Sequence, residues 1–370
     1  MINELFVLNT GGQVIYSWHH DEQEEDSKDE LVGGFLSALN SFATMERGED
    51  IKSLKLKETQ IIFERFEELE QQLTFVATTK SEELIELIHS IIHKIMDTFT
   101  AKYKERLDRP FDGDITPFKK FDENINEIFM AYGLDVLEST IEKIDAGNSL
   151  KSVLFLEPGD GDLLFIHAKQ YVDKDKMSYL IPLLTKSSKL LYERNLNQQL
   201  NWIMFNTIKN EILLIEIRAS IFLVKTYDLK ATSANTKQIL EIFDESHVST
   251  KKLKKLEKQF RDITYSENII QFFVVNFEGS ILFKHLQTNE SEYENNIPEI
   301  ISFLTSSKRA SQEIFNRNLL SCSIGGVSTV IFCVNLNNIA LIVIGNRRDL
   351  ESFEIIEEVY MDILAQLKSI

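Results

Sequence analysis

Histidines or carboxylates that could suggest a metal site occur at three places in the sequence. His89 and His93, in HSIIH, are four residues apart, a spacing that places two imidazoles on one helix face as in a two-histidine metal site. No third ligand is evident and the Glu of H-E-x-x-H is missing, so exposed helix positions are the favoured interpretation. A metal role is equally disfavoured for His19-His20, which end a predicted strand. The loop EPGDGD (157–162) has three acids but not the ligand spread of a calcium loop; a polar hairpin loop is favoured, and no metal is predicted.

No motif for nucleotide binding or nucleophilic catalysis is present in the sequence. It lacks a phosphate-cradling G-x-x-x-x-G-K-[ST] loop, so the chain is not itself a P-loop GTPase, and it lacks a G-x-S-x-G elbow. The pairs Gly11-Gly12 and Gly325-Gly326 are too short for dinucleotide fingerprints. Both fall in predicted hairpin turns, where glycine supplies a positive φ. We therefore predict no catalytic residues and no cofactor.

The two cysteines, Cys322 and Cys333, flank one of these predicted turns. If Gly325-Gly326 closes a tight turn, Cys322 lies opposite position 329, and Cys333 is not its cross-strand partner. Neither thiol has a nearby His and Asn in a catalytic context. Both are interpreted as ordinary strand residues in a reduced compartment.

The bulk composition indicates a packed globular protein with more than one core. The chain has 370 residues, of which 43% are hydrophobic and 26% charged, and this suits two or three domains. The formal charge of −18 disfavours sequence-independent nucleic-acid binding, which relies on clustered Lys and Arg. The acidic run 21–30 and the basic run 251–258 are both interpreted as solvated surface.

A cytoplasmic location is expected, with a peripheral membrane contact as the alternative. The N-terminus MINELFVLN lacks the basic region of a signal peptide, and the unbroken apolar runs are too short to span a bilayer. The alternative rests on the lysines of the basic run, which would contact anionic lipid. They are Lys251, Lys252, Lys254, Lys255 and Lys258.

One hairpin pattern occurs three times along the chain. Residues 5–18 read LFVLNTGGQVIYSW, residues 272–285 read FFVVNFEGSILFKH and residues 153–168 read VLFLEPGDGDLLFIHA. In each, a turn containing glycine separates two apolar runs, which is the usual hairpin signal. The turn glycines that align are Gly12, Gly279 and, less closely, Gly161. Such internal similarity predicts one domain plan used three times.

The first copy has the predicted element order ββαβββα. After the hairpin, apolar residues at a spacing of three or four lie on one helix stripe: Leu31, Phe35, Leu39 and Phe42. Three strand-like runs follow, in residues 51–58, 60–67 and 72–79. The copy ends with a helix that Ser81 can cap. Its buried stripe is predicted to consist of Leu84, Ile88, Ile91, Ile95 and Phe99.

The other two copies repeat this order, so the predicted fold class is α+β. Each copy is expected to form a five-stranded antiparallel sheet flanked by helices, which buries one face of every element. The predicted domains are residues 1–105, residues 149–262, which end in a long Lys-rich helix, and residues 263–370. Residues 106–148 begin with a stretch punctuated by Pro and Gly and are predicted to be a linker with one or two helices.

The order ββαβββα resembles the longin/roadblock superfamily of profilin-like domains. The first copy resembles it most, through FVLNTGGQVIYSW and LVGGFLSALNSFA, which look like longin-domain proteins of archaea related to eukaryotic trafficking regulators. The second copy is more similar to a roadblock or short longin domain, and the third fits either description. The resemblance is one of pattern and covers most of the chain.

Three longin domains in one chain resemble the tri-longin proteins, which act in pairs as guanine-nucleotide exchange factors for small Rab-like GTPases. The resemblance implies a non-catalytic binding protein for a small Ras/Rab-like GTPase that promotes nucleotide exchange as part of a dimeric complex. Longin and roadblock domains also serve as platforms, so a scaffold or adaptor subunit of a coat or tethering assembly is the alternative. The middle linker and the Lys-rich helix depart from the pattern of the tri-longin proteins.

Two surfaces are candidates for partner binding. The first is a row of small residues along the first predicted helix: Gly33, Gly34, Ser37, Ala38 and Ser41. This row packs either on its own sheet, which is the favoured interpretation, or on a partner. Two glycines inside a helix lower its stability by about 1–2 kcal/mol relative to alanine, so a close packing contact is expected to explain them. The second surface is formed by the sheet edges. Pairing within the chain leaves one of three copies unpaired, which predicts a homodimer or a heterodimer with another longin or roadblock protein.

Overall fold

The structure, a computed structural model, describes residues 2–20, 26–67, 72–79, 84–109, 111–147, 149–209, 211–228, 269–286, 293–336 and 339–346. The chain separates into two compact units, one formed mainly by Met1–Glu142 and the other by most of the chain from Lys143 onward. Ser81, the basic run 251–258 and the final helices predicted for the second and third copies lie outside the described residues.

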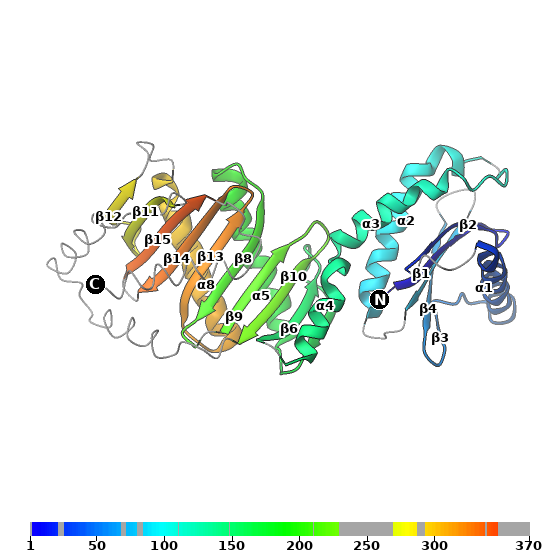
Figure 1. Cartoon of the computed structure of the whole chain (residues 1–370), viewed down its shortest axis with the longest axis horizontal. Coiled ribbons are helices and arrows are strands. Elements are labelled where there is room, and N and C mark those ends of the chain that lie inside the picture. Colours follow the sequence, from blue (N-terminus) through cyan, green and yellow to red (C-terminus); the bar gives the residue numbers. More distant parts are fainter. Residues whose placement is uncertain are drawn as a thin grey trace. The chain divides into compact units, whose positions relative to one another are not determined.

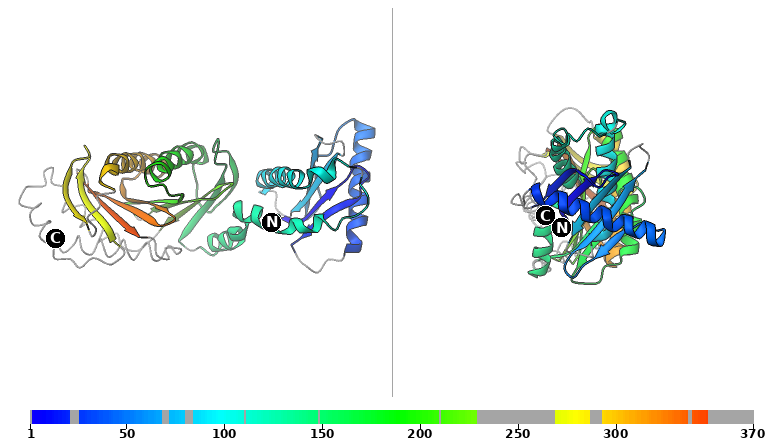
Figure 2. Two further views of the ribbon diagram at one scale, coloured as in Figure 1. Left: turned by 90° about the horizontal axis from the view of Figure 1, so that it is seen from above. Right: turned by 90° about the vertical axis from the view of Figure 1, so that its right-hand side faces the viewer.

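The first unit contains an antiparallel sheet between two long helices (Figure 1). Its strands are β1 (Ile2–Leu8), β2 (Val14–His19), β3 (Ser53–Lys55), β4 (Gln60–Phe66) and β5 (Leu73–Thr79). Its helices are α1 (Asp26–Arg47), α2 (Ile85–Leu107), the 3-10 helix η2 (Phe118–Phe121) and α3 (Asp122–Ala131), and α4 (Leu134–Asp145) follows. The sheet has the strand order β2-β1-β5-β4-β3, and Figure 2 places α1 and α2 on opposite faces of it. The order ββαβββα is confirmed for this copy.

The predicted buried stripe of α2 is confirmed. Its members recur every three or four residues, which places them on one side of the helix. Each is at most 4% exposed, and the five are Leu84, Ile88, Ile91, Ile95 and Phe99. Because α2 packs on β4 and β5, this stripe forms one half of the core of the first unit.

Aromatic side chains extend this core into the segment that follows α2. The rings of Phe118 and Phe121 are buried and lie 5.5 Å and 5.0 Å from the ring of Phe99. The Tyr16 hydroxyl donates a 2.7 Å hydrogen bond to Asp122, and burial raises the pKa of Tyr16 far above its usual value. The first part of the predicted linker therefore packs into the first unit, while the predicted boundary at residue 105 stays a prediction.

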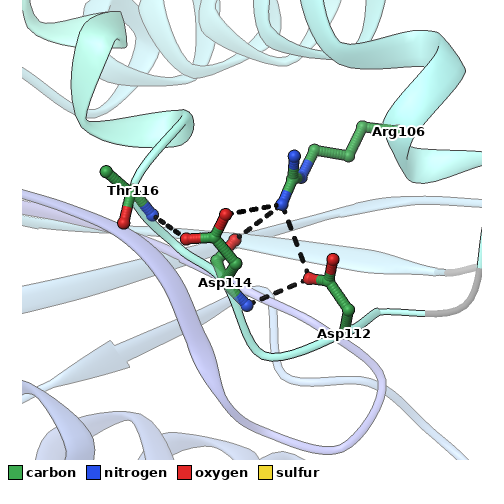
Figure 3. A network of polar contacts seen from close by, with 4 residues as sticks. All are labelled: Arg106, Asp112, Asp114 and Thr116. Atoms are coloured by element: carbon green, nitrogen blue, oxygen red, sulfur yellow. Dashed lines mark hydrogen bonds and ion pairs between the residues drawn. The ribbon is translucent and has the colours of Figure 1, made fainter.

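Ion pairs hold the loop between α2 and η2 (Figure 3). Arg106 Nη2 lies 3.0 Å from Asp114 Oδ2 and 3.5 Å from Asp112 Oδ1. Asp114 also accepts a hydrogen bond from the backbone N–H of Thr116 at 3.0 Å. Hydrogen bonds from Thr116, with the Arg106 charge, hold the pKa of the Asp114 carboxyl below its usual value. The loop is thereby held at the end of α2, where it leads into the buried η2.

The second unit is built on one 10-stranded antiparallel sheet with the order β12-β11-β15-β14-β13-β8-β9-β10-β6-β7. Its first half consists of β6 (Leu150–Leu156), β7 (Leu163–Ala168), β8 (Leu200–Thr207), β9 (Glu211–Ile217) and β10 (Phe222–Asp228), with α5 (Lys174–Lys189) and the π-helical η3 (Leu190–Asn195). Its second half consists of β11 (Ile269–Asn276), β12 (Ile281–Leu286), β13 (Leu319–Gly326), β14 (Thr329–Leu336) and β15 (Ile339–Asn346), with the 3-10 helix η4 (Glu294–Asn296) and α8 (Ile297–Phe315). Each half repeats the strand order of the first unit and has the order ββαβββ within the described residues.

The two halves of this sheet meet where β8 pairs with β13, and two glycines leave room for the contact. Gly325 lies opposite Trp202, and a Cβ on Gly325 would lie 2.5 Å from Trp202 Nε1. A Cβ on Gly326 would lie 2.6 Å from the ring of Tyr192, whose hydroxyl donates a 2.7 Å hydrogen bond to the Ile324 carbonyl. α5 and α8 also contact each other, on one face of the sheet (Figure 2). Large rings from one half thus occupy the space that the glycines of the other half leave open.

The predicted turn at Gly325-Gly326 is wrong. Both glycines lie inside β13, and Val327-Ser328 connects this strand to β14. The register places Cys322 directly opposite Cys333, so the prediction that they are not cross-strand partners is also wrong. Both thiols are buried and free, and a hydrogen bond with Cys322 together with burial raises the pKa of Cys333. The two errors have one cause, because a displaced turn changes every cross-strand pair of the hairpin.

The aligned hairpin glycines are confirmed as turn residues. Gly12, Gly161 and Gly279 have φ angles of +78°, +80° and +84°, in the left-handed region that glycine adopts without steric cost. The first and third hairpins also share an Asn three residues before the glycine. The side-chain oxygens of Asn9 and Asn276 accept hydrogen bonds from backbone N–H groups of these turns. The same side-chain-to-backbone hydrogen bonding by Asn therefore stabilises both hairpin turns.

Candidate functional site

Helix α1 carries an apolar stripe that is exposed to solvent. Leu31, Phe35, Phe42 and Met45 are 77%, 61%, 65% and 86% exposed. Together with the exposed Ala38, they follow one another at alternating intervals of four and three residues. This spacing lines them up on one side of the helix, as at the a and d positions of a coiled coil. A row of exposed apolar side chains of this kind is typical of a surface that contacts another protein.

Small residues bring the opposite side of α1 close to the sheet. Gly33 is buried, and a Cβ on it would overlap Val14 Cγ2. Ser37 lies over the β1–β2 turn, where a Cβ on Gly12 would come within 2.6 Å of the Ser37 side chain. Leu36, 2% exposed, belongs to the core cluster beneath the helix. The small side chains let the helix approach, so the larger apolar stripe remains outside.

The predicted row of small residues is therefore divided between two sides of the helix. Gly33 and Ser37 contact the sheet and its hairpin. The other three are exposed beside the apolar stripe, and they are Gly34, Ala38 and Ser41. Met45 and the outward direction of the stripe were not predicted from the sequence. Two signals in the sequence could have revealed them. The apolar residues continue at alternating intervals of four and three as far as Met45, and a separate row of small residues marks the side of the helix that can approach the sheet.

Alanine substitutions at two neighbouring glycines of α1 are expected to have opposite effects. Gly34→Ala should raise the free energy of unfolding by about 0.5–1 kcal/mol, because no atom lies within 4 Å of the added Cβ and alanine favours the helix. Gly33→Ala should lower it by about 1–3 kcal/mol, because its Cβ overlaps Val14. Urea unfolding of both variants checks this. Equal effects of the two substitutions would contradict the inward direction of Gly33.

Polar contacts at both ends of α1 fix its rotation on the sheet. Near its start, Asp29 Oδ1 lies 3.0 Å from His19 Nε2 at the end of β2. In its second half, the Asn40 side chain accepts a 3.2 Å hydrogen bond from the backbone N–H of Ile51. Asp29 and Asn40 are only 6% and 5% exposed. The exposed stripe is thus presented in a defined direction, and His19 has a structural role at the helix start.

The helices that correspond to α1 in the second unit have a partner. α5 and α8 occupy the same place in the element order, and they contact each other beside the paired strands β8 and β13. β8 and β13 are each 8 residues long, whereas the corresponding β3 has 3 residues and, among the described strands, pairs with β4 alone. Short edge strands that carry lysine, such as Lys55 on β3, resist further strand pairing. In the first unit the helix face, rather than the strand edge, is the surface suited to a partner.

The histidines with metal-ligand spacing both lie beside one carboxylate. His89 Nδ1 is 2.6 Å and His93 Nε2 is 3.5 Å from Glu64 Oε1 on β4. The structure therefore brings both predicted residues to Glu64, where they connect α2 to the sheet. Among the described residues, no group of three His, Cys, Asp or Glu is arranged to hold a metal ion.

Of the remaining predicted sites, the loop 157–162 forms a hairpin turn and the basic run lies outside the described residues. The loop 157–162 closes a hairpin through a 2.9 Å hydrogen bond from the Glu157 N–H to the Asp162 carbonyl. The lysines of the basic run 251–258 lie outside the described residues. No helix within the described part of the chain combines the length and the apolar character needed to cross a membrane.

The first unit is thus an α+β domain, with a five-stranded antiparallel sheet between helices and an apolar helix face open to solvent. Residues 3–111 match the family model described as the first longin domain of FUZ, MON1 and HPS1. This part of the chain is therefore a longin domain, as the sequence resemblance implied. The match ends before the second unit begins. No curated protein matches the chain.

Proposed function

We propose that this chain is a non-catalytic binding protein for a small Ras-like GTPase, and that it promotes nucleotide exchange within a dimeric complex of longin-domain chains. The exposed apolar face of α1 is the observation that carries the proposal. A longin domain of the FUZ, MON1 and HPS1 type suggests a family of trafficking-related GTPase regulators, which supports the choice of partner. In this proposal α1 contacts the GTPase, and the sheet behind α1 keeps it rigid.

An apolar helix face would act on a GTPase through conformation. Leu31, Phe35 and Phe42 have no side-chain group that transfers a proton or binds Mg²⁺. They can bind one conformation of the GTPase switch regions more tightly than another, and this difference shifts the population of the two states. Favouring a state in which the switch regions no longer hold Mg²⁺ would release the nucleotide. The expected activity is faster GDP release without hydrolysis.

Charge placed on the α1 stripe is expected to weaken GTPase binding strongly without unfolding the protein. Phe35→Glu should weaken GTPase binding by roughly 30-fold, which corresponds to about 2 kcal/mol for an apolar anchor at the centre of an interface. The side chain is 61% exposed, so stability should change by no more than about 0.5 kcal/mol. The measurement is release of fluorescent GDP from small Ras-like GTPases over a series of chain concentrations, which gives the concentration needed for half-maximal acceleration.

The matched control is Tyr171→Glu, because Tyr171 is an aromatic residue of the second unit that is 89% exposed. It should leave GDP release unchanged. Wild-type chain that neither accelerates release nor forms a complex with any cognate GTPase would rule out the proposal.

A scaffold or adaptor role is the alternative function, and the 10-stranded sheet favours it. The pairing of β8 with β13 joins two sheet halves of one plan into a continuous structure, so units of this plan can associate through a sheet edge. A scaffold would form a stable complex with another longin or roadblock protein, or with a second copy, and would leave GDP release unchanged. Analytical ultracentrifugation with wild-type and Phe35→Glu chains, together with the release assay, distinguishes the two functions.

A further inference from the structure

A groove of about 650 Å³ runs beside α5 in the second unit. It lies between α5 with η3, the β6–β7 loop and the start of β10. Its apolar lining consists of Pro158, Pro182, Leu183, Leu190 and Phe222. Leu183 and Leu190 are 48% and 56% exposed. The volume is within the range of ligand-binding clefts in proteins.

Three cations line the same groove: Lys186, Lys189 and Arg194. None of them forms an ion pair with a carboxylate of the described residues. Lys189 Nζ instead lies 6.0 Å from the ring centroid of Phe222. In a chain with a net charge of −18, acidic partners are abundant, and Lys225, for example, has one at 2.6 Å. With three cations against the single acid Glu193 in its lining, the groove is a site of net positive charge on an acidic protein.

Thr185, which also lines the groove, has a buried hydroxyl without a hydrogen-bond partner among the described residues. Thr185 is 1% exposed, and its Oγ1 has no hydrogen-bond partner among the described residues. Its neighbours Ser187 and Ser188 donate to carbonyls four residues earlier in the helix, at 3.0 Å and 2.8 Å, but Thr185 does not. A buried hydroxyl left unpaired destabilises the folded protein, because it has lost its hydrogen bonds to water without replacing them. An acceptor supplied by a ligand would remove this cost.

A proline inside α5 helps to build the groove. Pro182 has no N–H, so the Ser178 carbonyl lacks its helical donor. Gly161 packs directly against this carbonyl, and a Cβ on Gly161 would overlap its oxygen. This close approach brings Pro158 and Gly159 of the same loop over α5 as one wall. Another part of the wall is η3, a π-helical turn of the kind that is frequent at functional sites.

We propose that the groove binds an acidic peptide segment of a partner protein. An apolar side chain of the peptide would contact Leu183, Leu190 and Phe222, and its carboxylates would pair with Lys186, Lys189 and Arg194. The Thr185 hydroxyl would donate a hydrogen bond to a peptide carbonyl or carboxylate. The proposal does not depend on the GTPase function, because it rests on residues of the second unit alone.

The arrangement of charge favours a peptide over a membrane surface. Lys186 and Arg194 are eight residues apart along the consecutive helices α5 and η3, a spread of charge that carboxylates along a peptide can match. The groove is also lined by Glu193, and Glu157 and Asp160 are exposed on the adjacent loop. These acids would repel an anionic bilayer, whereas a peptide can place its carboxylates at the cations only. The recessed Thr185 hydroxyl likewise requires a group that enters the groove.

Fluorescence anisotropy with a labelled peptide of alternating Glu and Leu, added to the full chain, tests the proposal. The double variant Lys186→Glu/Lys189→Glu should bind this peptide at least about tenfold more weakly than wild type. A peptide with Gln in place of every Glu should lose binding to wild type by a similar factor. Binding should also weaken as salt is raised, since the contacts are partly exposed ion pairs.

A second variant separates binding from folding. Thr185→Val keeps the shape of the side chain and removes the unpaired hydroxyl, so the melting temperature should stay the same or rise. Peptide affinity should nevertheless fall several-fold, because the hydrogen bond to the peptide is lost. The matched charge control is Lys143→Glu/Lys174→Glu, which changes two exposed lysines outside the groove and should leave affinity within about twofold of wild type.

Three results would overturn the proposal. The first is peptide binding that is absent in wild type or unaffected by Lys186→Glu/Lys189→Glu. The second is an equal loss of binding in the control double variant, which would indicate a general charge effect. The third is binding to vesicles of phosphatidylcholine and phosphatidylserine in a 3:1 ratio that needs Lys186 and Lys189 and that the peptide does not compete for. This last result would assign the groove to membrane contact.

Discussion

Gly161→Ala should lower the free energy of unfolding of the second unit by about 3 kcal/mol. About 1–2 kcal/mol of this comes from forcing alanine into the left-handed backbone region, since φ at this position is +80°. The rest comes from overlap of the new Cβ with the Ser178 carbonyl oxygen, a backbone atom that cannot move without distorting α5. We expect the melting temperature of this unit to fall by roughly 10 °C, measured by differential scanning calorimetry.

The chain contains its own matched control for this substitution. Gly279 occupies the equivalent turn of the third copy with φ of +84°, but no atom lies within 4 Å of its Cβ position. Gly279→Ala should therefore lose only the backbone contribution, about 1–2 kcal/mol. If both substitutions have the same effect, the contact between the β6–β7 loop and α5 does not constrain Gly161, and the wall of the proposed peptide groove is less rigid than the structure indicates.

Gly325→Ala should destabilise the joint between the two halves of the 10-stranded sheet by about 2–3 kcal/mol. The added Cβ would lie 2.5 Å from Trp202 Nε1, and overpacking of a closed interior typically costs this much. Trp202 is 7% exposed and directly opposite Gly325 on β8, so its ring has little space to move into. Hydrogen exchange should accelerate most in β8 and β13, and denaturant unfolding should occur at lower concentration.

A double-mutant cycle identifies the cause of this loss. Trp202→Phe removes the indole nitrogen and ring fusion that the Cβ would meet, so Gly325→Ala should cost less in the Phe background than in the wild type. Gly159→Ala is the control, because Gly159 has no atom within 4 Å of its Cβ position and no positive φ. Strict additivity of Gly325→Ala and Trp202→Phe would contradict a direct clash.

Local features of the fold were predictable because their signals lie within short stretches of sequence. The positive φ of Gly12, Gly161 and Gly279 follows from their place between two apolar runs. The buried stripe of α2 follows from helical periodicity, as its member Phe99, which is fully buried, illustrates. The third copy was an exception, since Gly325-Gly326 looks like a turn and is a packing contact for Trp202 and Tyr192. A glycine pair alone does not distinguish these two uses.

The candidate surface on α1 was predictable in its location but not in its direction. Leu31, Phe35 and Phe42 lie on one stripe by spacing alone, and Gly33 and Ser37 lie on another. Which stripe turns toward the sheet depends on how closely Gly33 can approach Val14 and how Ser37 fits over Gly12. These contacts join residues that are distant in the chain, so periodicity does not report them.

The sequence by itself predicted one ββαβββα plan used three times, of which the described residues contain ββαβββα in the first copy and ββαβββ in the other two. It also predicted that the first copy resembles a longin domain and where its turns and periodic helices lie. Only the tertiary structure decided that the second and third copies share one sheet through β8 and β13, that Cys322 faces Cys333, and that Phe35 and Phe42 point to solvent. The physical reason is the distance along the chain between the residues that interact. Turns and periodicity depend on neighbouring residues, whereas strand pairing and the direction of a helix depend on side-chain volumes brought together from distant parts of the chain.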